Sequence, residues 1–150
     1  MRVSASNPLP EATRLTLTHR PMWRLAAYLW VMPVSLPALL LALVARASGA
    51  RLCWRDGVLE ACGGFLPVLL VRVYPPMPIA AITLGHVVLA RHTADLERTR
   101  THERVHVRQY ERWGGFFPLV YVGASLVVLL SGGDPYRDNP FEREAFGRET

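Results

Sequence analysis

Residues 101–106 read T-H-E-R-V-H and lie within the segment from Asp95 to Trp113, whose pattern predicts a helix that ends at two glycines. In a helix, His102 and His106 are one turn apart, so both imidazoles can reach the same metal ion. Glu103 lies on the same side and can take a proton from a water bound to that ion. The spacing therefore predicts a metal site with two histidine ligands and a glutamate as general base.

The predicted helix has two faces of different chemistry. One face carries His102, His106, Gln109, Tyr110 and Trp113, and the opposite face carries Arg100, Arg104 and Arg108. This division favours inward-facing histidines, although histidines in such a pattern can also be ordinary core or surface residues. The arginines indicate a solvated face, with binding of acidic lipid or nucleic acid as the alternative.

The third metal ligand has to come from outside this helix. A metzincin would continue with glycine at position 109 and histidine at position 112, where this chain has Gln109 and Arg112. Further along, residues 139–145 read N-P-F-E-R-E-A, which predicts a short helix with Asn139 as its N-cap and Pro140 at its first position.

Together, H-E-x-x-H-x-x-Q and the later N-P-F-E-x-E-A make residues 83–146 resemble the gluzincin-type zinc metallopeptidases. More narrowly, the two motifs resemble those of small bacterial H-E-x-x-H proteins. In gluzincins a later helix supplies a glutamate three residues before a small residue, so the resemblance implies Zn²⁺ held by His102, His106 and Glu142. Two alternatives stay open: Glu142 occupies the capping-box position and can act only as a cap, or Glu144 is the ligand.

The chain departs from the gluzincin pattern after Ala145, where many members have an aspartate that orients a ligand histidine and this chain has Phe146. Asp134 or Asp138 could replace that aspartate. Tyr136, close to the candidate ligand, could polarise a substrate carbonyl. His86 is interpreted as a histidine of a strand and not as a ligand.

A membrane anchor is the strongest signal near the N-terminus. The run from Leu25 to Ala45 carries no charge, is flanked by Arg24 and Arg46, and is long enough to cross a bilayer core of roughly 30 Å as a helix. Pro33 and Pro37 predict a kink in it. The alternative is a signal peptide cleaved among the small residues that follow.

A second apolar run, from Phe116 to Ser131, is shorter than the ~20 residues of a span and contains Pro118. If it crossed the bilayer, Glu142 would be on the opposite side from His102 and His106. We therefore expect a buried or interfacial helix and one true span. The expected organisation is a flexible tail at residues 1–21, a transmembrane anchor at 22–46 and a minimal zincin-like domain at 47–150.

A small sheet is expected before the metal-binding helix. The segment from Arg51 to Cys62, with Asp56-Gly57 at its centre, predicts a hairpin in which Cys53 faces Glu60, too far from Cys62 for an unstrained disulfide. The segment from Ile79 to Arg91 is rich in β-branched residues and predicts a strand whose edge could pair with an extended peptide. These elements predict an α+β fold with an antiparallel sheet of three or four strands.

Composition alone does not select a function. The net charge is +5, and all 17 basic residues are arginine, a balance that suits nucleic acid, anionic lipid or acidic substrates equally well. We expect a membrane-associated zinc metallopeptidase with peptide or protein substrates and membrane lipid as partners. The alternatives are a zinc-binding but inactive membrane module and, without any recognisable fold motif, a nucleic-acid-binding protein.

The resemblance places the chain in a bacterial cell membrane. Arginines are balanced on the two flanks of the anchor, so charge does not orient it. The two cysteines, expected to be free, favour the cytoplasmic side for the domain.

Overall fold

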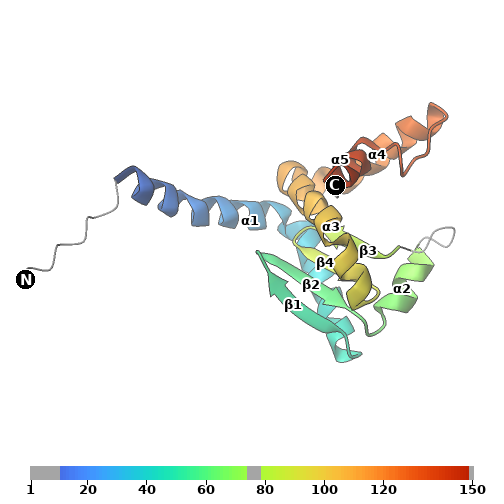
Figure 1. Cartoon of the computed structure of the whole chain (residues 1–150), viewed down its shortest axis with the longest axis horizontal. Coiled ribbons are helices and arrows are strands. Elements are labelled where there is room, and N and C mark those ends of the chain that lie inside the picture. The colour runs from blue at the N-terminus through green and yellow to red at the C-terminus, as the bar shows by residue number, and fades with distance from the viewer. Residues whose placement is uncertain (1–10, 74–78, 149–150) are drawn as a thin grey trace, which may run out of the picture.

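The computed structural model describes the backbone of residues 11–73 and 79–148 and the side chains of residues 22–73 and 79–148. Helix α1 extends over Glu11–Ala47 and contains the whole expected anchor. Figure 1 shows that its blue N-terminal part points away from the sheet, whereas its cyan C-terminal part lies against it. The kink expected at Pro33 and Pro37 stays a prediction.

The expected tail at residues 1–21 is in part helical. Residues 1–10 lie outside the described residues, and residues 11–21 form the first turns of α1. This stretch contains alanine, leucine and arginine, which are strong helix formers, and Pro10 stands just before the start, where proline is well tolerated.

The sheet is mixed, not antiparallel as expected. Its strands are β1 (Arg51–Arg55), β2 (Val58–Cys62), β3 (Ala81–Leu84) and β4 (Val87–Ala90), in the order β1-β2-β4-β3. Strands β1 and β2 are antiparallel, and so are β3 and β4, but β2 and β4 are parallel. After β2, helix α2 (Leu66–Val73) carries the chain across, and the chain then forms edge strand β3 before it turns back into β4. Strand β4 therefore runs in the same direction as β2.

The first hairpin was predicted correctly and the second was missed. Cys53 faces Glu60 and both cysteines are free, as the Asp56-Gly57 turn predicted. The expected single strand from Ile79 to Arg91 is instead a hairpin that turns at Gly85 and His86. Gly85 has φ +66°, and a Cβ there would collide with the Ser35 side chain of α1. Glycine at the first position of a two-residue turn permits this reversal.

The sheet lies between two helical layers. On one face, Ala61 and Leu89 pack against Ala38, Ala42 and Ala45 of α1, whose small side chains allow the helix to approach closely. On the other face, the sheet packs against α3 (Thr93–Trp113), whose Leu96 and Val107 share a core cluster with Val58, Val88 and Ala90. The predicted helix Asp95–Trp113 is thus confirmed, and its position across the sheet fixes where the histidines lie.

A sharp turn follows α3. Gly114 begins the 3-10 helix η1 (Gly114–Phe116) with φ +60°, and a Cβ at this position would overlap the indole of Trp30 in α1. Helix α4 (Phe117–Leu130) then leads away from the sheet (Figure 1). The close approach of Trp30 brings α1 into contact with the end of α3.

Helix α4 is not buried. We expected the run from Phe116 to Ser131 to form either a buried or an interfacial helix, and the structure excludes the buried one. Within α4 only Phe117 is buried, and Leu126, Val127 and Leu130 are among its exposed side chains. The chain then folds back: Asn139 Nδ2 donates to the Tyr121 carbonyl at 3.2 Å and to Ser125 Oγ at 2.8 Å. The residue that begins α5 (Pro140–Phe146) is therefore held against the middle of α4.

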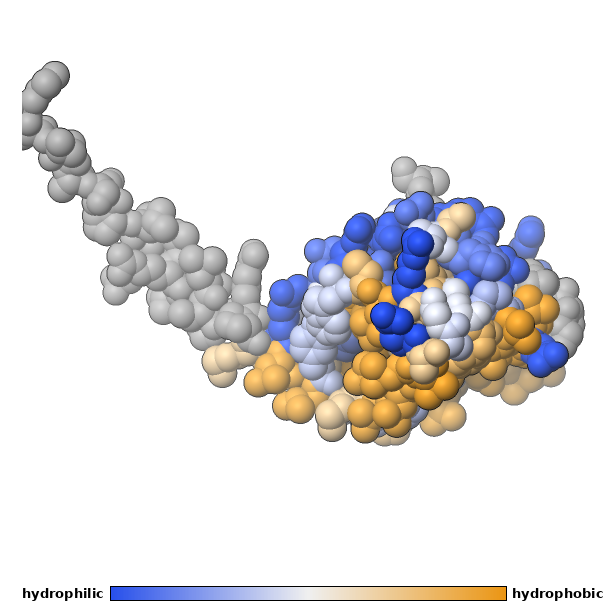
Figure 2. Space-filling model, turned by 90° about the horizontal axis from the view of Figure 1, so that it is seen from below, coloured by the Kyte–Doolittle hydropathy of each residue, from blue (hydrophilic) through white to orange (hydrophobic). Residues whose placement is uncertain are grey.

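Two helical segments are long and apolar enough to cross a membrane, namely Met22–Ala47 and the longer run Thr93–Leu130. In the second, the charged side chains belong to α3, and the uncharged part extends from Trp113 to Leu130. Figure 2 shows hydrophobic side chains gathered along the lower side of that view and hydrophilic ones above them. The large exposed apolar residues lie mainly on α1 and α4.

Candidate metal centre

The two histidines of α3 are buried beside each other. His102 is 6% exposed and His106 is 8% exposed, and their Nε2 atoms are 3.0 Å apart. Both side chains face the interior, as the pattern predicted. Two ring nitrogens this close cannot both carry a proton, so the pair is suited to share one cation.

Glu142 of α5 completes the group. Its Oε2 lies 3.1 Å from Nε2 of His102, and its Oε1 lies 3.4 Å from Nε2 of His106. One ligand atom from each of the three residues falls within 4.8 Å of the others, and all three residues are buried. Nitrogen and oxygen donors that converge in this way could hold a metal ion.

The start of α5 explains why Glu142 faces the histidines. Asn139 is fully buried, and its Oδ1 caps the helix by accepting a hydrogen bond of 2.9 Å from the backbone N–H of Phe141. The N–H of Asn139 itself donates to the carbonyl of Tyr136. Glu142 is therefore not needed for a capping box, and its carboxylate points towards His102 and His106.

Tyr121 of α4 supplies a hydrogen bond that the sequence did not reveal. Its hydroxyl donates to Oε1 of Glu142 at 2.7 Å. Burial by itself would raise the pKa of Glu142, but the two histidines and this hydroxyl lower it to about 2. The carboxylate is consequently held in the charged form that a metal requires.

Gln109 connects His106 to α5. Its Oε1 lies 2.8 Å from Nδ1 of His106, and its Nε2 donates to Oε2 of Glu144 at 2.9 Å and to the carbonyl of Phe141 at 3.0 Å. An amide oxygen at Nδ1 holds the proton on that nitrogen and leaves Nε2 free to bind a cation. Glu144, the alternative ligand, instead anchors this amide.

Glu103 is buried next to the three candidate ligands, with 4% exposure. The hydroxyl of Thr83, on edge strand β3, donates to its Oε2 at 2.6 Å. Burial raises the pKa of Glu103 above its ordinary value, and the opposing effects of His106, Thr83 and His102 are smaller. A carboxylate with a raised pKa is a better proton acceptor, as a general base must be.

The charges of the group also act on His106. Burial lowers its pKa, but the carboxylates of Glu142 and Glu103 outweigh this effect and leave the pKa above its ordinary value. A positive charge between these side chains is therefore favoured by its surroundings, whether it is a proton or a metal ion.

The remaining candidates Tyr136, Asp134 and Asp138 belong to the segment before α5. Tyr136 is 36% exposed in the turn before α5, and its ring packs edge-on against Phe146, which in turn lies 4.9 Å from the ring of His102. The two aspartates expected to orient a histidine do not do so: Asp138 accepts from the N–H of Asp134, and Asp134 accepts from the N–H groups of Tyr136 and Arg137. They shape the turn because their side chains are short and close to its backbone.

His86, interpreted as a strand histidine, lies instead in the β3–β4 turn, and its Nε2 is 3.1 Å from Glu111. It is outside the metal group.

Sequence reasoning missed Thr83 and Tyr121 and gave Gln109 no role beyond its helix face. The contact of Gln109 with His106 could have been predicted, because Gln109 follows His106 by about one turn on the same side of the helix. The contacts of Thr83 and Tyr121 could not have been predicted from the sequence, because they depend on how β3 and α4 pack against α3 and α5. Comparisons with protein-family models, with curated proteins and with solved structures find no match for this chain.

Proposed function

We propose that this protein is a membrane-associated zinc metallopeptidase of the gluzincin type. The observation that carries the proposal is the convergence of His102, His106 and Glu142 beside the buried carboxylate of Glu103. Tetrahedral zinc with ligands at about 2.0 to 2.2 Å places its ligand atoms roughly 3.3 Å apart. The two Nε2 atoms are 3.0 Å apart, and they lie 3.1 and 3.4 Å from the two different oxygens of Glu142, distances close to this spacing.

The residues present divide the work of peptide hydrolysis. His102, His106 and Glu142 would hold the metal, which supplies an activated water and polarises the scissile carbonyl. Glu103 accepts the proton of the attacking water and passes it to the leaving amine. Thr83 holds Oε2 of Glu103, and Gln109 holds the ring of His106, so both groups are oriented before a substrate binds. Tyr136 is a further candidate to polarise the carbonyl.

Edge strand β3 is suited to hold an extended peptide. It lies at the end of the sheet and pairs only with β4 among the described residues. In this hairpin Leu84 and Ile82 bond to β4, so the backbone groups of Ala81 and Thr83 point to the open side. The side chain of Thr83 contacts Glu103, so a peptide paired with this edge would run past the general base.

The apolar helices support a location at the membrane. Two segments have the length and composition of spans, and the exposed apolar residues of α4 lie on the helix that supplies Tyr121 to the site. Peptide segments near or in a bacterial membrane are therefore the substrates that this arrangement favours.

A zinc-binding but inactive module is the second candidate, and one observation favours it. The ring of Phe146 lies 4.9 Å from that of His102, and Tyr136 packs against Phe146, so aromatic rings cover this side of the group. A zinc ion closed off in this way would serve folding and not catalysis.

The test is metal analysis and peptide cleavage on the purified full-length protein in detergent. We expect one zinc per chain, lost in His102→Ala and in His106→Ala, because each removes a nitrogen ligand. His92→Ala, which changes an exposed histidine at the start of α3, is the matched control and should keep the metal. Stoichiometric zinc in both ligand variants would overturn the proposal.

Glu103→Gln separates the enzyme from the inactive module. The amide cannot accept a proton from water, so this variant should retain zinc and lose cleavage of a quenched-fluorescent peptide library. If the zinc-loaded wild-type protein cleaves no peptide, the structural role is favoured. If Glu103→Gln cleaves at the wild-type rate, Glu103 is not the base.

A further inference from the structure

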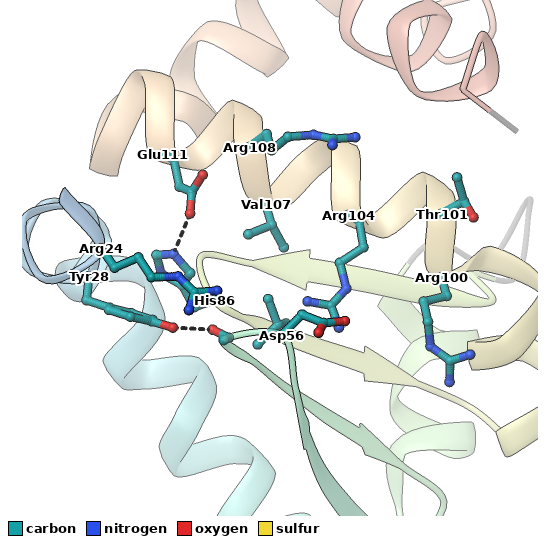
Figure 3. A pocket seen from close by; sticks show the side chains of 12 residues that line it. Arg24, Tyr28, Asp56, His86, Arg100, Thr101, Arg104, Val107, Arg108 and Glu111 are labelled. Carbon is teal, nitrogen blue, oxygen red and sulfur yellow. Dashed lines mark hydrogen bonds and ion pairs between the residues drawn. The ribbon is translucent and has the colours of Figure 1, made fainter. Parts of the chain in front are cut away.

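A second site lies on the arginine-bearing face of α3, turned away from the metal centre. It is an open pocket of about 490 Å³ between α3, the N-terminal part of α1 and the turns of both hairpins. Figure 3 shows arginines entering it from two elements, Arg24 from α1 and Arg104 from α3. A volume of this size is sufficient for a small polar ligand or a lipid headgroup.

The pocket carries an excess of positive charge. Arg100 and Arg104 both contact Oε1 of the buried Glu60, at 3.2 and 2.9 Å, so two guanidinium groups share one carboxylate. Arg104 also donates to the carbonyl of Arg55 at 2.8 Å, which fixes its position. The expectation that the arginine face of α3 is solvated is thus only partly correct, since Arg100 and Arg104 lie against the sheet.

Arg24 and Arg108 line the same pocket and are exposed. Among the described residues neither forms an ion pair with a carboxylate, whereas Arg100 and Arg104 do. A guanidinium presents parallel N–H donors that match two oxygens of a phosphate group. These two side chains are therefore the available donors for an anion.

The wall of the pocket contains an unsatisfied polar atom. His86 is 5% exposed, and its Nε2 contacts Glu111 at 3.1 Å, but its buried Nδ1 has no hydrogen-bond partner in the described part of the chain. Buried polar atoms of this kind are uncommon and often mark a place where a ligand binds. Its ring packs at 4.4 Å against Tyr28, whose hydroxyl donates to the Gly57 carbonyl and joins α1 to the hairpin turn (Figure 3).

We propose that this pocket binds the phosphate group of an anionic ligand, with Arg24 and Arg108 as direct donors and Arg104 as a fixed neighbouring cation. Its four arginines, Arg24, Arg100, Arg104 and Arg108, outnumber the two acidic residues of its lining, Asp56 and Glu111. The site is separate from the metal group and does not depend on the proposed peptidase activity.

The position of the pocket favours a phospholipid headgroup as the source of the phosphate. Arg24 immediately precedes the apolar run of α1, and its neighbour Trp23 is 65% exposed. Trp54 is 63% exposed and its ring stacks with Tyr28 at 6.4 Å, so it lies beside the pocket. Exposed tryptophans next to arginines are typical of the membrane–water interface.

The test uses the full-length protein reconstituted in phosphatidylcholine nanodiscs that contain increasing fractions of phosphatidylglycerol. Binding is followed by the rise in thermal unfolding temperature and by tryptophan fluorescence. The double variant Arg24→Gln/Arg108→Gln should bind phosphatidylglycerol about tenfold or more weakly, because each arginine makes a hydrogen bond between charged groups. The control Arg46→Gln/Arg112→Gln removes the same charge from the other end of the anchor and from the next turn of α3, and should bind as the wild type does.

A second arm titrates inorganic phosphate into the same protein in discs without anionic lipid. Phosphate binding that is lost in the pocket variant, and that is weaker in discs containing phosphatidylglycerol, supports a phosphate site filled by lipid. Phosphate binding without any response to the lipid keeps the site and assigns it to a soluble anion. Equal binding of both probes by the pocket and control variants overturns the proposal, because charge alone would then explain it.

Discussion

The side chain of Gln109 on α3 donates a hydrogen bond of 2.9 Å to Oε2 of Glu144 on α5. The Oε1 atom of the same amide accepts a hydrogen bond from Nδ1 of His106, so this histidine is linked to the helix that carries Glu142. Orientation of a metal ligand by an outer hydrogen bond commonly contributes ten- to hundredfold to affinity, as an order of magnitude.

From this link we expect Gln109→Ala to weaken zinc binding about ten- to hundredfold while the protein remains folded. Competition with a chelator of known zinc affinity measures the change, and circular dichroism checks the fold. Glu144→Gln is the mild counterpart, because its amide oxygen can still accept from Gln109. Unchanged zinc affinity in Gln109→Ala would show that His106 needs no such support.

Glu142 and Glu144 form a matched pair for identifying the third ligand. Each substitution by glutamine removes one negative charge from α5, but only Glu142 faces the two histidines. Glu142→Gln should weaken zinc binding on the order of a hundredfold, since a neutral amide is a poor ligand for zinc, and Glu144→Gln should change it little. The same chelator competition distinguishes them, and the reverse order of losses would make Glu144 the ligand.

Gly114→Ala should destabilise the protein by roughly 2 to 4 kcal/mol, because a side chain at positive φ is strained and its Cβ would overlap Trp30. Gly115→Ala is the control, since a Cβ at that neighbour meets nothing within 4 Å. Denaturant unfolding in detergent compares the two. A similar loss in both variants would mean that the contact between Trp30 and the end of α3 is unimportant for stability.

Asn139 is bonded to the middle of α4, so the chain folds back along α4 after this helix ends. Glu142 can reach His102 and His106 only because of this reversal. Single cysteines placed at Arg98 and Arg148, in a background with Cys53 and Cys62 changed to serine, should therefore react with an impermeant thiol reagent from the same side of sealed vesicles. A cysteine at Leu130, which is 79% exposed at the apolar end of α4, should be protected by lipid. Labelling of Arg98 and Arg148 positions from opposite sides would place α4 across the bilayer and exclude Glu142 as a ligand.

Local sequence was sufficient for several features of the chain. The spacing of His102 and His106 places them on one side of a helix because helical geometry is periodic. The Asp56-Gly57 turn set the register of the first hairpin, because a two-residue turn leaves only one pairing. The cap at Asn139 was predicted for the same kind of reason, since its side chain bonds a backbone group two residues away.

Other features were decided only by tertiary packing. The parallel pairing of β2 with β4 depends on where α2 returns the chain, and the exposed position of α4 depends on the bend at Gly114. The choice between Glu142 and Glu144 could not be made locally either, because both lie on one short helix. In the structure, the side of α5 that meets α3 brings Glu142 to the two histidines and Glu144 to Gln109. Contacts between segments distant in sequence arise from the packing of whole elements, and no local pattern of residues encodes that packing.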